Sequence, residues 1–340
     1  MTGAGRYAEL ASAVRSFKAE LIKPEQIERF VESGSLSETV SLLTRGHVTS
    51  VDPSDPTPAE AYLVRRVIEL AQRLVAYAPH DSRPLIKLFP RRYELECVKG
   101  VLRAIFDQLP PEEAVRQIVP VGRFSEERCK ELAEARNPSR VIEAIDDEAL
   151  KHFLSSRLSG ERSSMAAVFS VDLFYYAMLW AATSLPDPLD AQVARGLVGQ
   201  LIDHYNILST FRARLVGLDA RSTSDLLIQV NYALGHSLNE LAESANVQNL
   251  VRVIEKTPYA NAFEGVNVED TSVAKVERVL NRSHAVSCLN VFAGSPFNVG
   301  LALGFLFLKN YELHDIFTII NGKANNVPID RVMDSLILRS

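Results

Sequence analysis

Cysteine is scarce in this chain, with only Cys97, Cys129 and Cys288 among 340 residues. The number is odd, and no two of them have the Cys-x-x-Cys spacing of a metal or redox motif. This pattern argues against a disulfide framework and favours buried thiols in a reducing compartment. The start of the chain also lacks a basic stretch followed by an apolar core, so we expect no signal peptide.

Neither sign of charge is in large excess, since 37 basic and 42 acidic side chains give a formal net charge of −5. Nucleic-acid-binding domains usually show a basic excess, and a polybasic membrane anchor needs clustered lysine and arginine. We therefore expect no nucleic-acid partner and no anchor of this kind. The length and the apolar fraction of 47% suffice for a large core without disulfides or metals.

The chain has few long apolar runs, and two of them need testing as membrane spans. Residues 299–308 number ten, about half the length that crosses a bilayer. Residues 166–185 are long enough but contain Asp172, which would cost about 2.5–3.5 kcal/mol near the bilayer centre. We interpret both runs as core helices and expect no transmembrane span.

The familiar catalytic motifs are missing. The sequence contains no GxxxxGK[ST] phosphate loop, no GxGxxG, no HExxH and no GxSxG. Its seven histidines are dispersed, and none lies three or four residues from another, so no helix face offers a zinc pair. Asp203 and His204 could suggest acid-base chemistry, but we interpret them as structural. We predict no catalytic residue, no cofactor and no metal.

What the sequence does contain is an internal repeat. Residues 131–134 and residues 240–243 both read Glu-Leu-Ala-Glu, with 109 residues between the two starting points. At the same spacing, Glu94 corresponds to Asp203 and then to Glu312. Ungapped agreement in two blocks, with one block seen three times, predicts three copies of a unit of roughly one hundred residues.

The apolar spacing inside the repeat is helical. Leu95, Val98 and Leu102 follow one face at a period of 3.6 residues, and Leu313 and Ile316 begin the same stripe in the third copy. No sustained strand alternation is present. Asn321-Gly322 follows an apolar helical turn and predicts a C-terminal cap. The sequence therefore predicts an all-α protein.

We expect three homologous helical domains at residues 7–110, 111–220 and 221–340. Each is long enough to form a small domain of its own. Three related domains in one chain suggest a pseudo-threefold ring or funnel.

The recurring acids Glu94, Asp203 and Glu312 are the most informative polar feature. One interpretation is structural, in which each acid pairs with an arginine or caps a neighbouring helix. A second is that the acids line a central opening and meet a basic partner. A catalytic role is the third, although no base or metal ligand repeats with them. The position three residues later holds Cys97, Asn206 and Asp315.

The third repeat resembles a specific family from Ser295 onward. A proline-led apolar helix is followed by Lys309 and Glu312, then by Gly322-Lys323 and finally by Pro328. This order is similar to the C-terminal signature of the C subunit of archaeal and bacterial V/A-type rotary ATPases, a relative of the d subunit of vacuolar ATPases.

The other repeats resemble the same family. In the second, Asp203, Asn206 and Arg212 match an Asp-x-x-Asn-Ile…Arg segment. In the first, Glu94 and Lys99 lie in the equivalent stretch. Asp315-Ile316-Phe317 departs from the Asn-Leu-Arg of the family, so the arginine is lost.

The resemblance implies a funnel of three helical domains that does not hydrolyse ATP. Such a protein sits on the membrane rotor ring, at the cytoplasmic face, and receives the central stalk. It couples the stalk to proton or sodium transport during ATP synthesis or hydrolysis. Two alternatives remain open: a helical interaction scaffold unrelated to rotary ATPases, and an enzyme whose site is assembled across repeats from scattered carboxylates.

Overall fold

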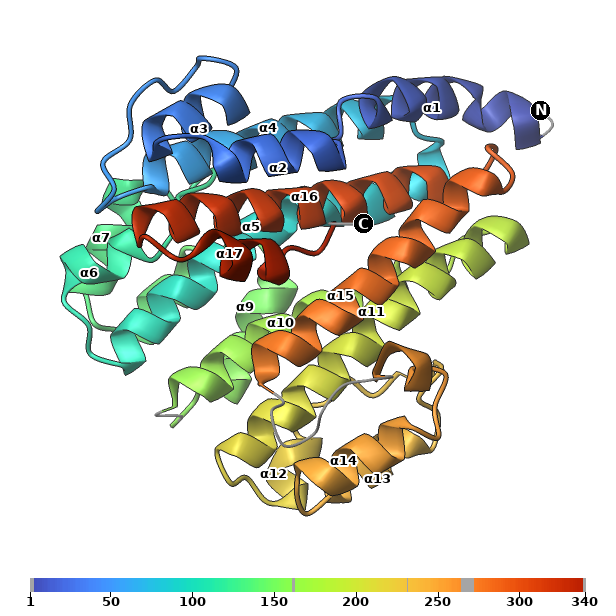
Figure 1. Ribbon diagram of the computed structural model, residues 1–340. Coiled ribbons are helices and arrows are strands. Elements are labelled where there is room, and N and C mark those ends of the chain that lie inside the picture. Colours follow the sequence, from blue (N-terminus) through green and yellow to red (C-terminus); the bar gives the residue numbers. More distant parts are fainter. Residues whose placement is uncertain (1–2, 161–162, 231, 264–271, 339–340) are drawn as a thin grey trace. The chain divides into compact units, whose positions relative to one another are not determined.

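The structure is a computed structural model that describes residues 3–160, 163–230, 232–263 and 272–338 (Figure 1). Within these ranges every regular element is a helix, and the only strand-like pairs are two isolated bridges, Asp52 with Asp55 and Val121 with Phe124. The all-α prediction is confirmed.

The helices follow one another along the whole described chain. The α-helices are α1 (Gly3–Lys18), α2 (Pro24–Glu32), α3 (Leu36–Leu43), α4 (Thr57–Tyr77), α5 (Arg83–Phe106), α6 (Pro111–Arg116), α7 (Glu126–Glu134), α8 (Pro138–Glu143), α9 (Glu148–Arg157), α10 (Ser164–Ala181), α11 (Pro188–Leu215), α12 (Ala220–Ser224), α13 (Ser237–Glu243), α14 (Val247–Ile254), α15 (Val273–Asn290), α16 (Gly300–Ala324) and α17 (Ile329–Ser335). Short 3-10 turns are η1 (His80–Ser82), η2 (Ala260–Phe263) and η4 (Val291–Ala293).

The chain forms two compact units, which we name after their longest complete helices. The α11 unit comprises residues 1–11 and 176–311, and the α5 unit comprises residues 12–175 and 312–340. The chain passes between them within α1, α10 and α16. These two units do not coincide with the three domains expected from the repeat, so the threefold division stays a prediction.

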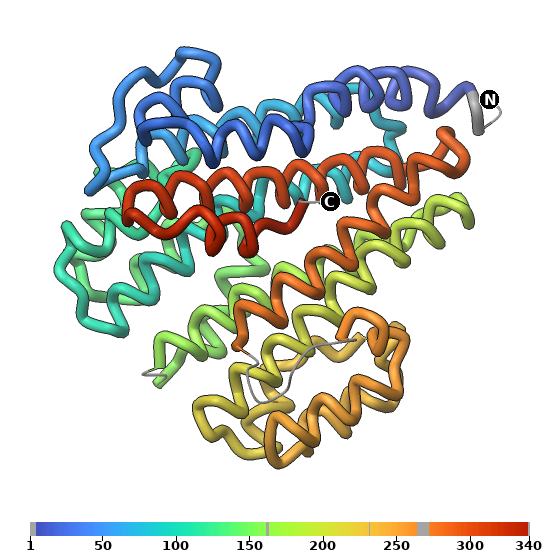
Figure 2. Tube along the Cα trace, viewed as in Figure 1, coloured from blue at the N-terminus to red at the C-terminus, as the bar shows by residue number. Residues whose placement is uncertain are grey.

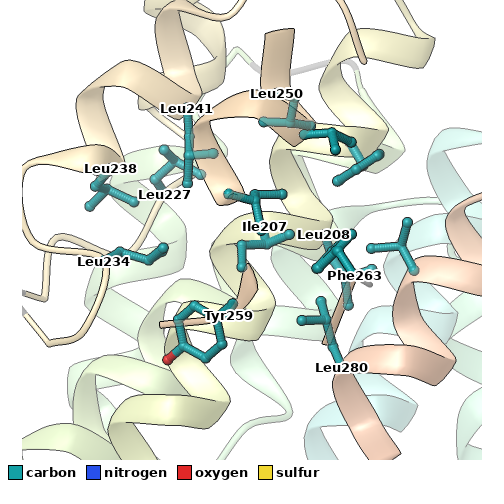
Figure 3. Close-up of a cluster of buried hydrophobic side chains, with 14 of the residues drawn as sticks. Ile207, Leu208, Leu227, Leu234, Leu238, Leu241, Leu250, Tyr259, Phe263 and Leu280 are labelled. Carbon is teal, nitrogen blue, oxygen red and sulfur yellow. The ribbon is translucent and has the colours of Figure 1, made fainter. Parts of the chain in front are cut away.

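The α11 unit is built on two long antiparallel helices, α11 and α15 (Figure 2). Leu197 near the start of α11 contacts His284 in the second half of α15, whereas Arg212 near its end contacts Glu277. The short helices α12 to α14 pack against the second half of α11. Their shared core includes Ile207, surrounded by leucines and aromatic rings (Figure 3).

The α5 unit is built on a second antiparallel pair, α4 and α5, joined by η1. Helices α6 to α8 follow α5 and pack on it or on one another, and α9 packs on α8. The second half of α16 shares a core with α3 and α4, in which Leu313, Ile316 and Ile320 are buried. Helices α2 and α17 pack together beside it.

The predicted apolar stripes are buried as expected. Leu95, Val98 and Leu102 lie in the interior, and so does the whole run of residues 299–308. The predicted cap at Asn321-Gly322 is wrong, because α16 continues to Ala324 and the residue with positive φ is Asn326. Gly322 is needed for a different reason: a Cβ there would lie 2.6 Å from Val332 Cγ2, so α17 packs directly on the α16 backbone.

Among the described helices, α10 is the one whose length and composition would allow it to cross a membrane, and core helices pass the same test. Asp172 on this helix accepts a hydrogen bond from Lys99 Nζ at 2.7 Å, and Glu96 lies 2.8 Å from the same nitrogen. Burial alone would lower the pKa of Lys99, but the carboxylates of Asp172 and Glu96 raise it. The charged residue of α10 is therefore paired within the α5 unit.

Candidate functional site

One polar position recurs in the same structural role. Asn206 on α11 is fully buried and pairs with Ile228, which lies 22 residues later: its amide nitrogen donates to the Ile228 carbonyl at 3.0 Å, and its oxygen accepts from the Ile228 N–H at 2.8 Å. Asp315 on α16 accepts from the N–H of Ile337, again 22 residues later, at 2.7 Å, and from that of Leu338 at 2.8 Å. Each side chain thus links a long helix to the backbone of the segment 22 residues later in the chain.

In the first repeat the equivalent position is Cys97, whose thiol makes a similar contact. Cys97 on α5 donates to the carbonyl of Val119, also 22 residues later, at 3.1 Å. Cys129 on α7 is close enough to Cys97 that hydrogen bonding between the two thiols raises the pKa of the Cys97 thiol. Three occurrences of one helix-to-backbone contact at the predicted spacing support the internal repeat.

The three acids one helical turn earlier differ in what they contact. Asp203 is fully buried, and its Oδ2 accepts hydrogen bonds from the N–H groups of Ala233 and Leu234 at 3.0 and 3.1 Å and from the Tyr259 hydroxyl at 2.7 Å. Burial raises the pKa of Asp203 to about 6, although the hydrogen bonds act in the opposite direction. Two of these three hydrogen bonds come from the loop that follows α12, so Asp203 holds this loop against α11.

Glu312 on α16 is also buried, with 3% of its surface exposed. Its Oε2 accepts from the N–H of Ile22, in the segment before α2, at 2.6 Å. Farther along α16, Lys323 Nζ donates to the carbonyls of Val31 and Ser33 at 2.8 and 2.7 Å, at the end of α2. A lysine there satisfies carbonyls that the helix leaves unpaired and complements the negative end of the helix dipole. Two family-motif residues therefore hold the N-terminal segment of the α5 unit onto α16.

Glu94 differs from both of its counterparts. It is only half-buried, and no described residue donates a hydrogen bond to it or pairs with it. Gly122, with a φ of +59°, lies directly over the carboxylate, and a Cβ at this glycine would come within 2.7 Å of Glu94 Oε1. The loop after α6 can lie this close to Glu94 because residue 122 has no side chain.

Glu94 lines a cavity of about 1340 Å³ that belongs entirely to the α5 unit. One face of α4 and one face of α5 form its walls, and residues 120–126 and 145–149 close it at the rim. Apolar lining comes from side chains such as Ile68, Val98 and Phe124, with charged groups around them. The cavity is a half-open trough with a mixed apolar and charged lining.

The remaining predicted residues are placed separately. Arg212 forms an ion pair of 3.3 Å with Glu277, joining α11 to α15, and both side chains are about two-fifths exposed. Lys309 lies half-exposed on α16. The structure thus distributes the predicted residues along long helices instead of gathering them into one site.

The Asp203-His204 pair has no geometry for acid-base catalysis. Asp203 is bound to its loop, whereas the His204 ring packs edge-on against Tyr259 and His284, with ring centroids 5.1 and 6.0 Å apart. Burial lowers the pKa of His204 well below its usual value and that of His284 to about 4. Among the described residues, no group of three histidine, cysteine or acidic side chains could hold a metal ion.

Sequence reasoning missed the partners of these residues and the cavity. Tyr259 and Ile22 carry no motif, and the trough is formed by ordinary amphipathic helices. The only sequence signal near the cavity was Gly122, which follows Pro120 and Val121.

Comparison with known proteins places these features in a family. The profile of the family described as ATP synthase (C/AC39) subunit matches residues 10–335. The C subunit of the A-type ATP synthase of Methanocaldococcus jannaschii is 25% identical, over 97% of this chain and 86% of its own length. The C subunits of the A-type ATP synthases of Methanosphaera stadtmanae (25% identical, 95% and 86%) and Methanothermobacter thermautotrophicus (26% identical, 91% and 82%) are similar over comparable spans.

These findings confirm the resemblance to the C subunit of V/A-type rotary ATPases and the prediction of a non-catalytic subunit. The match extends over nearly the whole chain and includes all three repeated positions. The chain belongs to the ATP synthase (C/AC39) subunit family.

Proposed function

We propose that this chain is the rotor adaptor of a V/A-type ATP synthase or ATPase, joining the central stalk to the membrane rotor ring. The observation that carries the proposal is the family match over residues 10–335. The curated relatives are named as subunits of A-type ATP synthases, which supports a place in such a complex and favours this function over an unrelated helical scaffold.

The internal construction suits a part that transmits torque. An adaptor must resist twisting, and buried hydrogen bonds between side chains and backbone fix one packed arrangement more sharply than apolar contact alone. Asn206, Asp315 and Lys323 provide such contacts at separate places along α11 and α16. In this proposal the three repeats form a funnel with pseudo-threefold symmetry, and the chain lies at the cytoplasmic face as a peripheral subunit.

Ion pumping tests the function directly. Membrane vesicles containing the rotary complex should acidify, or take up sodium, when ATP is added. Removing this chain should leave ATP hydrolysis by the soluble head in place but abolish pumping, and adding the purified chain should restore it. Equal pumping with and without the chain would refute the adaptor function.

A further inference from the structure

The trough between α4 and α5 has the dimensions of a helix-binding groove. Its lining positions on α4 recur every three or four residues from Ala61 to Val75. At 1.5 Å per residue this wall is about 20 Å long, the length of three to four helical turns. The volume of about 1340 Å³ exceeds the range of about 300–1,000 Å³ that is usual for small-molecule pockets. The shape therefore fits a protein segment better than a metabolite.

The lining of the trough has the mixed apolar and charged character of a protein interface. Ile68, Val75 and Val121 are partly exposed and supply apolar surface, whereas Leu95 and Val98 are buried. Charged side chains also line the trough, and among them acids outnumber bases by six to four. The acids are Glu69, Glu94, Glu126, Asp146, Asp147 and Glu148, and the bases are Arg65, Lys87, Arg91 and Arg123. Stable interfaces combine apolar contact surface with polar groups in the same way.

Most of the charges that close the trough are already paired. Arg91 contacts Asp147, and Arg123 contacts Asp146. Arg65 and Lys87 are exposed to water. Glu94 is the acid that is partly withdrawn from water and has no donor among the described residues.

Comparison with the other two repeats shows that Glu94 lacks, among the described residues, the hydrogen-bond donors of its counterparts. Its counterpart Asp203 receives three hydrogen bonds from a loop and from Tyr259, and Glu312 receives one from Ile22. In the first repeat Gly122 lies against the carboxylate, and the described residues of its loop donate no hydrogen bond to Glu94. A half-buried carboxylate gains most from a charged donor that is itself shielded from water.

We propose that the trough between α4 and α5 binds an amphipathic helix of a partner protein, and that a lysine or arginine of this helix pairs with Glu94. The apolar face of the helix covers Ile68 and Val75, in the manner of helix-in-groove recognition. This inference rests on the proposed function, because it gives the adaptor a specific contact with another member of the rotary complex.

The test uses the rotary complex stripped of this chain and measures how tightly the purified chain binds back. Glu94→Gln should weaken binding about tenfold, and the difference should shrink as salt is raised because screening weakens the charge pair. Glu20→Gln removes the same charge from an exposed position outside the trough and should bind like the wild type. Gln72→Trp, at an exposed lining position, should block the groove without disturbing the core.

Crosslinking identifies the occupant. A photoreactive amino acid at position 72 should capture a helical peptide with a lysine or arginine among apolar residues. Glu94→Gln and Gln72→Trp variants that bind as tightly as the wild type would overturn the proposal, as would a captured segment without a basic residue or a small molecule filling the trough. Wild-type chain that fails to bind the stripped complex at all would instead refute the adaptor function.

Discussion

Asn206→Asp replaces the side-chain amide by a carboxyl group at a position where both hydrogen-bonding partners are backbone groups of Ile228. The amide donates to the Ile228 carbonyl and accepts from the Ile228 N–H, and its side chain is completely buried. An ionised carboxylate keeps the second hydrogen bond but turns an oxygen toward the carbonyl. Losing one hydrogen bond costs about 1 kcal/mol, and leaving the buried carbonyl unpaired adds about 1–3 kcal/mol. We expect a loss of about 3 kcal/mol in the free energy of unfolding at neutral pH.

The same variant should depend on pH in a definite direction. A protonated carboxyl can donate to the Ile228 carbonyl as the amide does, so folding favours the protonated form and raises the pKa of residue 206 above the unfolded value of about 3.9. Its stability is then closest to wild type at or below about pH 4 and falls as the pH rises through the folded pKa.

Urea unfolding followed by circular dichroism at about pH 4.5 and pH 7.5 measures this effect, and hydrogen exchange of the Ile228 amide reports it locally. Asp315→Asn is the reciprocal control. Asp315 accepts from two N–H groups, so an amide nitrogen there would face a donor and the variant should also be destabilised. An Asn206→Asp protein within about 0.5 kcal/mol of wild type at neutral pH would refute the assignment of these hydrogen bonds as stabilising.

The remaining predictions concern α16, titration and catalysis. Lys323→Met should lower stability by about 1–2 kcal/mol, seen as a lower melting temperature, because it leaves the last carbonyls of α2 unpaired. Gly322→Ala should cost about 1–3 kcal/mol by overpacking, and adding Val332→Ala should recover part of the loss in the same melting assay. His284 has a folded pKa of about 4, so it binds a proton more readily in the unfolded state than in the folded state. The free energy of unfolding should therefore fall by up to about 3 kcal/mol as the pH falls from 6.5 to 4. Asp203, with a folded pKa of about 6, should offset part of this loss, and His284→Gln should flatten the profile of urea midpoint against pH. The purified chain should release no phosphate from ATP, and sustained turnover would contradict a non-catalytic role.

Local sequence determined the secondary structure and the register of the repeat. Helix formation depends on residues three and four apart, so the stripe of Leu95, Val98 and Leu102 was readable without any tertiary information. The spacing of 109 residues marked Asn206 and Asp315 as equivalent because a shared ancestry preserves register even where identity is low. Their matching contacts, each with the backbone 22 residues later, follow from that register.

Only the tertiary structure decided what the three acids do. Glu312 is bound by Ile22, 290 residues away, and Asp203 by Tyr259, 56 residues away, while Glu94 is left facing a trough. A carboxylate has the same local preferences in all three places, so sequence pattern cannot distinguish them. Their environments depend on which distant backbone N–H or hydroxyl is brought within hydrogen-bonding distance of α5, α11 and α16, and this is set by the packing of the core within each unit.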